Sequence, residues 1–173
     1  SKVYLLYENP ANMISRNKDL WIIIIFYVLL VSALLAGTLY LNNGHFILAL
    51  DDPYIHMTMA KNFVTNGHWA TNNMDFTSAS SSPLWILLIS GVYLIFGVVL
   101  NIIFQLASII LAYRILKQFN VSEYLSLILL VFILVIPLMP ILFVGMEHSA
   151  QIFFALLFIM FGSSLITGEE KGS

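Results

Sequence analysis

Residues 20–41 read LWIIIIFYVLLVSALLAGTLYL, a run without Asp, Glu, Lys or Arg. This run decides the fold class, because a helix of about 20 apolar residues is what the hydrocarbon core of a bilayer requires. Inside lipid, every backbone N–H and C=O group must find its partner within the protein, which favours a helix. The run therefore predicts a membrane-spanning helix at residues 21–41.

The overall composition also indicates that the chain lies in a lipid bilayer. Of the 173 residues, 60% are hydrophobic and 9% are charged, whereas a soluble domain carries roughly 25% charged residues. Seven Lys and Arg residues accompany nine Asp and Glu residues, so the chain has no basic field with which to bind nucleic acid. The absence of Cys excludes disulfides and thiolate metal sites. We therefore expect a multi-pass integral protein of the lipid bilayer, most naturally in the plasma membrane of a prokaryote.

Three further stretches lack charged residues: 76–113, 124–146 and 148–168. The second and third predict spans at residues 123–144 and 148–167. The first contains 38 residues, more than one span needs and slightly fewer than two spans with a loop require. It therefore crosses the membrane either once, at residues 98–117, or twice.

The positions of the basic residues favour one crossing, because basic residues gather in the cytoplasmic segments of membrane proteins. With one crossing, six of the seven lie on the cytoplasmic side: Lys2, Arg16, Lys18, Arg114, Lys117 and Lys171. Residues 83–96 then form a juxtamembrane helix at the outer surface. The alternatives for this stretch are a short span, or a longer tilted helix that continues into the next segment.

The predicted fold class is all-α, a polytopic transmembrane helical bundle with about four spans, at 21–41, 98–117, 123–144 and 148–167. Residues 1–19 and 168–173 are predicted to be cytoplasmic. The outer loop, 42–97, holds two juxtamembrane helices at 53–66 and 83–96. The chain begins without Met and ends on a short polar tail, which suggests processing or a fragment.

The outer loop opens with two adjacent acids in the stretch DDPYIHMTMAKNFVTNG, residues 51–67. This stretch predicts a helix with Asp52 as N-cap, Pro53 at its first position and a stop at Asn66-Gly67. Capping alone explains an acid there, but ionised groups next to a span are costly and mark functional sites. Asp51 and Asp52 together can bind a divalent cation, or one of them can act as a general base.

Glu147 is the second informative acid, in the sequence GMEH between two predicted spans on the same outer face. It would also complement the dipole of the last helix, which is the simpler explanation. The four His residues do not have the spacing of metal ligands. Asn101, Gln105 and Ser108 share one face of the span at 98–117, where we expect them to contact other helices rather than lipid.

These motifs together resemble a known family. DDPYI at 51–55 follows the first span, Pro83-Leu84-Trp85 follows a Ser-rich run, and Gly145-Met146-Glu147 opens the last span. This order resembles the N-terminal module of the GT-C-fold membrane glycosyltransferases. The class includes protein O-mannosyltransferases, aminoarabinose transferases and the catalytic subunits of oligosaccharyltransferases. The likeness extends over residues 20–167.

The resemblance implies an enzyme of the EC 2.4 type that takes a sugar from a polyprenyl- or dolichyl-phosphate donor. The acceptor is a hydroxyl on the outer side of the membrane, and the phosphate is displaced with inversion. Asp51 or Asp52 would be the general base, with Asp51 favoured because Asp52 is the better helix cap. Glu147 would orient the acceptor. Other residues implied to contact the substrates are Tyr54, His56, Lys61 and His148.

The resemblance leaves two matters open. A divalent metal, Mg or Mn, is a possible cofactor, and Asp51, Asp52 and Glu147 would be its ligands. The chain is also much shorter than enzymes of this class, and Lys61 is alone as an outer basic residue. The alternative is therefore a non-catalytic four-span subunit or scaffold related to this class, completed by a further membrane chain or by C-terminal spans.

Overall fold

The computed structural model describes residues 18–72, 76–77, 79–91, 97–119, 121, 123–134 and 138–169. Within these residues the regular structure is helical, apart from one isolated bridge between Trp69 and Phe76, which confirms the all-α class. The helices are α2 (Lys18–Leu41), α3 (Asp52–Asn66), α4 (Pro83–Gly91), α5 (Gly97–Gln118), α6 (Glu123–Ile133), α7 (Met139–Val144) and α8 (His148–Glu169). The predicted N-terminal segment lies outside the described residues, except for the start of α2. The predicted tail does too, except that α8 runs on to Glu169.

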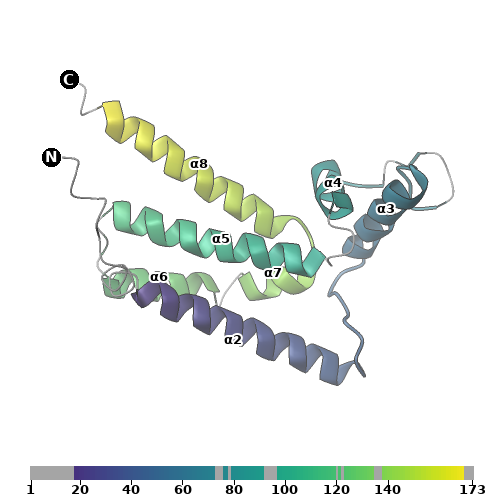
Figure 1. Cartoon of the computed structure of the whole chain (residues 1–173), viewed down its shortest axis with the longest axis horizontal. Helices are drawn as coiled ribbons and strands as arrows, with labels where there is room; N and C mark the ends of the chain where they lie inside the picture. Colours follow the sequence, from purple (N-terminus) through teal and green to yellow (C-terminus); the bar gives the residue numbers. More distant parts are fainter. Residues whose placement is uncertain are drawn as a thin grey trace, which may run out of the picture.

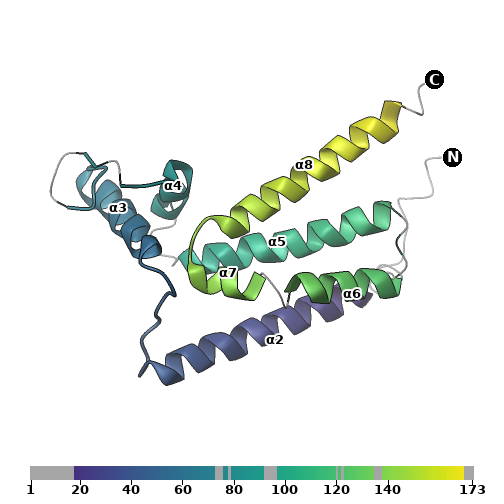
Figure 2. The same cartoon turned by 180° about the vertical axis from the view of Figure 1, so that it is seen from behind.

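The long helices lie side by side, and the short pair α3 and α4 sits at one end of them (Figure 1). α2 runs toward this end, and α5 and α8 run away from it, as the view from behind also shows (Figure 2). α5 packs most extensively against α8, and α3 packs against α4. The arrangement therefore separates a bundle from a small two-helix unit at one end of it.

Two helices are long and apolar enough to cross a membrane, Lys18–Leu41 and Val98–Gln118. They coincide with the predicted spans at 21–41 and 98–117. His148–Ser163 is a shorter apolar helix by the same measure.

The segment predicted as a single span at 123–144 contains two described helices. α6 ends at Ile133 and α7 begins at Met139, so the continuity of this span stays a prediction. Residues 135–137, which include Pro137, lie outside the described part of the chain.

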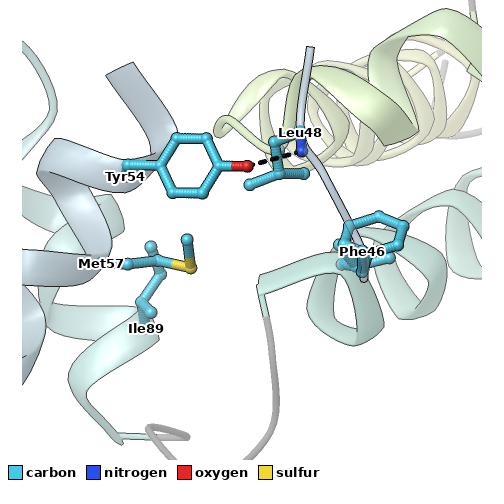
Figure 3. A pocket seen from close by; sticks show the side chains of 7 residues that line it. Phe46, Leu48, Tyr54, Met57 and Ile89 are labelled. Carbon is cyan, nitrogen blue, oxygen red and sulfur yellow. Dashed lines mark hydrogen bonds between the residues drawn. The ribbon is translucent and has the colours of Figure 1, made fainter. Parts of the chain in front are cut away.

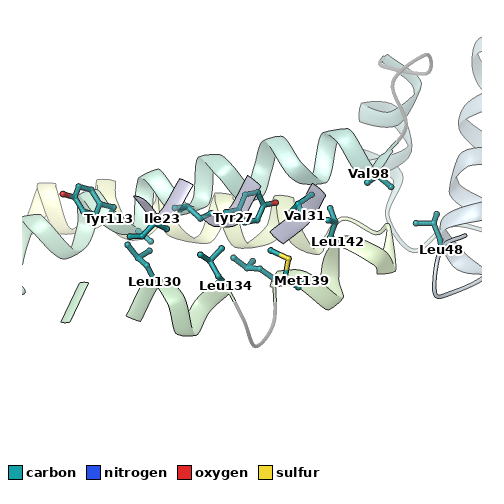
Figure 4. Packing of buried hydrophobic residues seen from close by; sticks show 13 residues of the cluster. Ile23, Tyr27, Val31, Leu48, Val98, Tyr113, Leu130, Leu134, Met139 and Leu142 are labelled. Atoms are coloured by element: carbon teal, nitrogen blue, oxygen red, sulfur yellow. The ribbon is translucent and has the colours of Figure 1, made fainter. Parts of the chain in front are cut away.

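The main core is formed where α2 meets α5, α6 and α7 (Figure 4). α2 contributes one stripe of buried residues, Ile23, Tyr27 and Val31, spaced one turn apart. Its other faces expose large apolar residues such as Phe26 and Leu29. A helix that is apolar on every side and buried on one stripe fits an apolar surrounding medium.

Gln105 joins the helices of this bundle through one buried side chain. The Tyr27 hydroxyl of α2 donates to Gln105 Oε1 over 2.7 Å. Gln105 Nε2 donates to the carbonyl of Leu138, the residue before α7, at 2.8 Å, and to Ser149 Oγ at 3.1 Å. The predicted polar stripe on α5 is fully buried, and for Gln105 its expected contacts with other helices are confirmed.

Replacing Gln105 with Leu is expected to lower the free energy of unfolding by about 2 kcal/mol, since it leaves buried polar groups on three other segments without a partner. Tyr27→Phe removes one of these bonds and is expected to cost about 1 kcal/mol. Unfolding by SDS from mild-detergent micelles, followed by circular dichroism, measures both. Thr38→Val is the control, because the Thr38 hydroxyl bonds only within its own helix, to the Leu34 carbonyl. Equal losses for Gln105→Leu and Thr38→Val would contradict the role of Gln105.

Candidate functional site

The segment before α3 is held by two hydrogen bonds, one to α3 and one to α7. The Leu48 N–H donates to the Tyr54 hydroxyl at 2.8 Å, and the Ala49 N–H donates to the Phe143 carbonyl at 2.9 Å. The first bond borders an apolar cavity of about 120 Å³, shown in Figure 3. Tyr54, predicted to contact substrate, therefore uses its hydroxyl to position the segment that leads to the two acids.

Asp51 and Asp52 are both exposed at the start of α3. The predicted cap is wrong by one position: Asp51 is the N-cap residue and Asp52 is the first residue of the helix. Pro53 is equally tolerated at the second position, because no N–H in the first turn has a partner within the helix. The Asp51 side chain makes no capping hydrogen bond. The reason for preferring Asp51 over Asp52 as a base is therefore lost.

The predicted stop of the helix is confirmed, since Gly67 adopts the left-handed conformation with φ of 71°.

Glu147 lies in the turn between α7 and α8, directly before the first residue of α8. Its Oε1 accepts a short hydrogen bond from the Ser82 hydroxyl, 65 positions away in the sequence. Its Oε2 is buried and has no hydrogen-bond partner among the described residues. Ser82 in turn precedes α4, where its carbonyl accepts from the Trp85 and Ile86 N–H groups. Glu147 thus links the starts of α4 and α8.

Gly145 allows α3 to approach this turn closely. It ends α7 with φ of 72°, a conformation that side chains other than glycine's disfavour. A Cβ atom there would lie 2.9 Å from a Leu48 methyl carbon and 3.2 Å from Pro53 Cβ. The start of α3, with its two acids, therefore packs against the turn that carries Glu147.

His56 is a buried residue of α3 that interacts electrostatically with Glu147 and Asp52. It follows Asp52 by one helical turn and is 2% exposed. Burial lowers its pKa below the ordinary 6.5, although the Glu147 and Asp52 carboxylates act to raise it. His56 is therefore neutral at pH 7 and lies within the field of both carboxylates. Its Nδ1 has no hydrogen-bond partner in the described part of the chain.

A cavity of about 380 Å³ opens beside Glu147, between α4 and α8. Its lining is mostly apolar, and Ser82 and Glu147 give it a polar end. Trp85 forms one wall and is 1% exposed, with its Nε1 lacking a partner among the described atoms. The lining residues are Ser82, Pro83, Leu84, Trp85, Leu88, Glu147, Ala150, Gln151 and Phe154.

Two predicted site residues stand apart from this group. Lys61 is exposed on α3, and nine residues of helix separate it from Asp52 by about 13 Å. His148, the first residue of α8, has its Nδ1 3.3 Å from Gln151 Oε1. The structure therefore places His56 within the field of Asp52 and Glu147, whereas Asp51 and Lys61 are exposed.

The predicted metal ligands are Asp51, Asp52 and Glu147. Within the described ranges, no three or more His, Cys, Asp and Glu side chains are grouped closely enough to hold a metal ion. One oxygen of Glu147 is already bonded to Ser82. Mg or Mn as a cofactor stays a prediction, and no chemical step is assigned to a metal.

Sequence reasoning missed the partners of Glu147. Ser82 belonged only to the Ser-rich run before Pro83, and Trp85 was noted only as part of the Pro-Leu-Trp motif. Asn101 was assigned to helix packing, yet it is fully buried and neither end of its amide has a partner among the described residues. The polar stripe on α5 was the sequence feature that could have identified Asn101 as a functional candidate. For Ser82 no local signal exists, because its partner is distant in the sequence.

The chain matches no family model, no curated protein and no solved structure. The family resemblance drawn from the motifs therefore has no independent support from these comparisons. A function must be argued from the residues that the fold brings together.

The lowered pKa of His56 predicts that acid destabilises the protein. Below pH 6.5 an unfolded chain takes up a proton at His56 that the folded chain does not, so stability is full above pH 6.5 and falls as the pH approaches the lowered value. His56→Gln is expected to flatten this pH dependence. Glu147→Gln is expected to leave the onset of the loss near pH 6.5 and to make the loss larger at low pH, because removing a carboxylate that raises the pKa of His56 lowers its folded-state pKa further.

Thermal unfolding between pH 5 and 7.5 measures this dependence. His45→Gln is the matched control, because His45 is exposed on the segment before α3 and should leave the slope unchanged. A wild-type slope that persists in His56→Gln would show that another group carries it.

Proposed function

We propose that this chain is the N-terminal module of a membrane glycosyltransferase similar to the GT-C class. Its substrate would be a sugar carried on a polyprenyl or dolichyl phosphate, and its acceptor a hydroxyl at the outer surface. The observation that carries the proposal is that His56 lies within the field of Asp52 and Glu147, with Asp51 next to Asp52 in the sequence and a cavity lined by Glu147 at the same end of the bundle. Carboxylates at the edge of an apolar cavity suit the role of a general base.

The distribution of charge supports an outer location for this end. α2 begins at Lys18 and α5 ends with Arg114 and Lys117 near its last turn, at the end of the bundle opposite α3 and α4 (Figure 2). Basic residues favour the cytoplasmic side, so the acids would face outward.

We propose four crossings, by α2, by α5, by α6 with α7, and by α8. We propose one crossing between residues 83 and 118, because it leaves Arg114 and Lys117 on the cytoplasmic side.

The proposed reaction needs a base and an oriented acceptor. Asp51 or Asp52 takes the proton of the acceptor hydroxyl, the oxygen bonds to the anomeric carbon, and the bond from that carbon to the phosphate oxygen breaks. The polyprenyl phosphate leaves as an anion, and the configuration of the sugar inverts. Glu147, held by Ser82, would position the acceptor.

A second candidate is a non-catalytic four-span subunit, favoured by the shortage of basic residues at this end. Among the described residues, Lys61 is the only Lys or Arg there. An anionic donor phosphate usually binds to Arg, Lys or backbone N–H groups. An active enzyme would therefore need further spans, or a further membrane chain, to supply these groups.

Asp51→Asn with Asp52→Asn is expected to lower sugar transfer by about 100-fold or more, because a general base contributes that much. The assay uses the full chain in membranes of its source, with polyprenyl phosphate carrying a labelled hexose, and follows the label from lipid to acceptor. Glu147→Gln is expected to raise KM for the acceptor more than it lowers kcat. Asp19→Asn, at the opposite end of α2, is the control. Unchanged transfer in the double variant would refute the assignment of the general base to Asp51 or Asp52. Absence of transfer in the wild type would favour the second candidate, a non-catalytic four-span subunit.

A further inference from the structure

One face of α8 continues from Glu147 along the whole helix. Counting from Glu147, steps of four and three residues lead to Gln151, Phe154, Phe158, Phe161 and Leu165, a spacing that places them on one face. The four apolar members, which we call the α8 stripe, are exposed by 50%, 79%, 59% and 72%. The stripe extends over about 16 Å of helix. α8 therefore has a polar head beside Glu147 and a long apolar surface below it.

The cavity between α4 and α8 begins where the stripe does. Glu147, Gln151 and Phe154 line the cavity from α8, and Leu84 and Leu88 line it from α4. Leu84 is 66% exposed, so the cavity is open at the molecular surface. The cavity and the stripe together form one continuous surface, polar at one end and apolar along the rest.

The charge at the polar end selects the kind of headgroup. No Lys or Arg belongs to the lining, and Glu147 is its one ionisable group. An anionic headgroup in a mostly apolar cavity would be repelled by this carboxylate. A hydroxyl, by contrast, can donate a hydrogen bond to a carboxylate oxygen, as Ser82 already does. The cavity is therefore unsuited to the phosphate of a sugar donor.

We propose that the cavity between α4 and α8 binds a lipid with a neutral, hydroxyl-bearing headgroup. Its hydroxyl donates to Glu147, and its hydrocarbon tail lies on the α8 stripe. This inference rests on the proposed function, for which it names the acceptor as a membrane lipid that enters sideways between the two helices.

Trp85 provides a probe within the cavity itself. The chain has three Trp residues, so Trp21→Phe with Trp69→Phe leaves Trp85 as the only one. The full chain with these changes is titrated in detergent micelles with a monoacylglycerol brominated on its acyl chain. The comparison ligand is the same brominated lipid with a phosphate on the glycerol. Bromine quenches tryptophan fluorescence at short range, so quenching reports a tail beside Trp85.

The monoacylglycerol is expected to quench Trp85 saturably, with an apparent affinity about tenfold higher than that of its phosphate. Phe154→Ala is expected to weaken this binding by about tenfold, because it removes apolar contact area. Glu147→Gln is expected to abolish the preference for the uncharged lipid. Ile159→Ala is the matched control: Ile159 is 49% exposed on a different face of α8 and should leave binding unchanged.

Equal quenching by the two lipids would overturn the proposal, since it would indicate general contact with apolar chains. Lack of saturable quenching would also overturn it, and would favour another helix as the occupant of the stripe. The binding assay requires no turnover. Selective binding without sugar transfer would thus refute only the proposed glycosyltransferase activity. Sugar transfer without selective binding would refute only the proposal that the acceptor is a membrane lipid.

Discussion

The fold depends on one buried amide. Among the described residues, Gln105 is the single side chain that bonds to α2, to Leu138 before α7, and to α8. Between apolar helices, packing and polar bonds must supply the specificity that burial from water supplies in soluble proteins. Gln105 also bonds to Ser149, two residues after Glu147, so the contact that fixes the bundle also fixes the start of α8. The candidate site therefore takes its position from the core.

Close backbone packing then brings the distant acids together. Gly145 leaves space for Leu48 and Pro53 that any side chain would fill, and Tyr54 holds the preceding segment in place. As a result, His56 is buried within the field of Asp52 and Glu147. Burial outweighs the effect of the two carboxylates on its pKa, so the imidazole stays neutral. A charged His56 at the same position would instead neutralise the site.

Local patterns in the sequence predicted what local chemistry controls. The charge-free run at 21–41, the stop at Gly67 and the helix start at Pro83 each follow from residues within a few positions of one another. The bond between Ser82 and Glu147 and the burial of His56 depend on contacts across the fold, which no spacing in the sequence reveals.

The shortage of positive charge at the α3–α4 end also bears on the proposed reaction. A sugar donor brings a phosphate, and a leaving phosphate needs cationic or N–H donors to stabilise the charge that develops on it. The described residues at this end offer acids, a neutral His56 and an exposed Lys61, all of which suit the acceptor better than the donor. A module of this composition would contribute the base and the acceptor cavity. The groups that bind the phosphate would then have to come from another part of the enzyme, so the acceptor and donor halves of the site would lie on separate structural units.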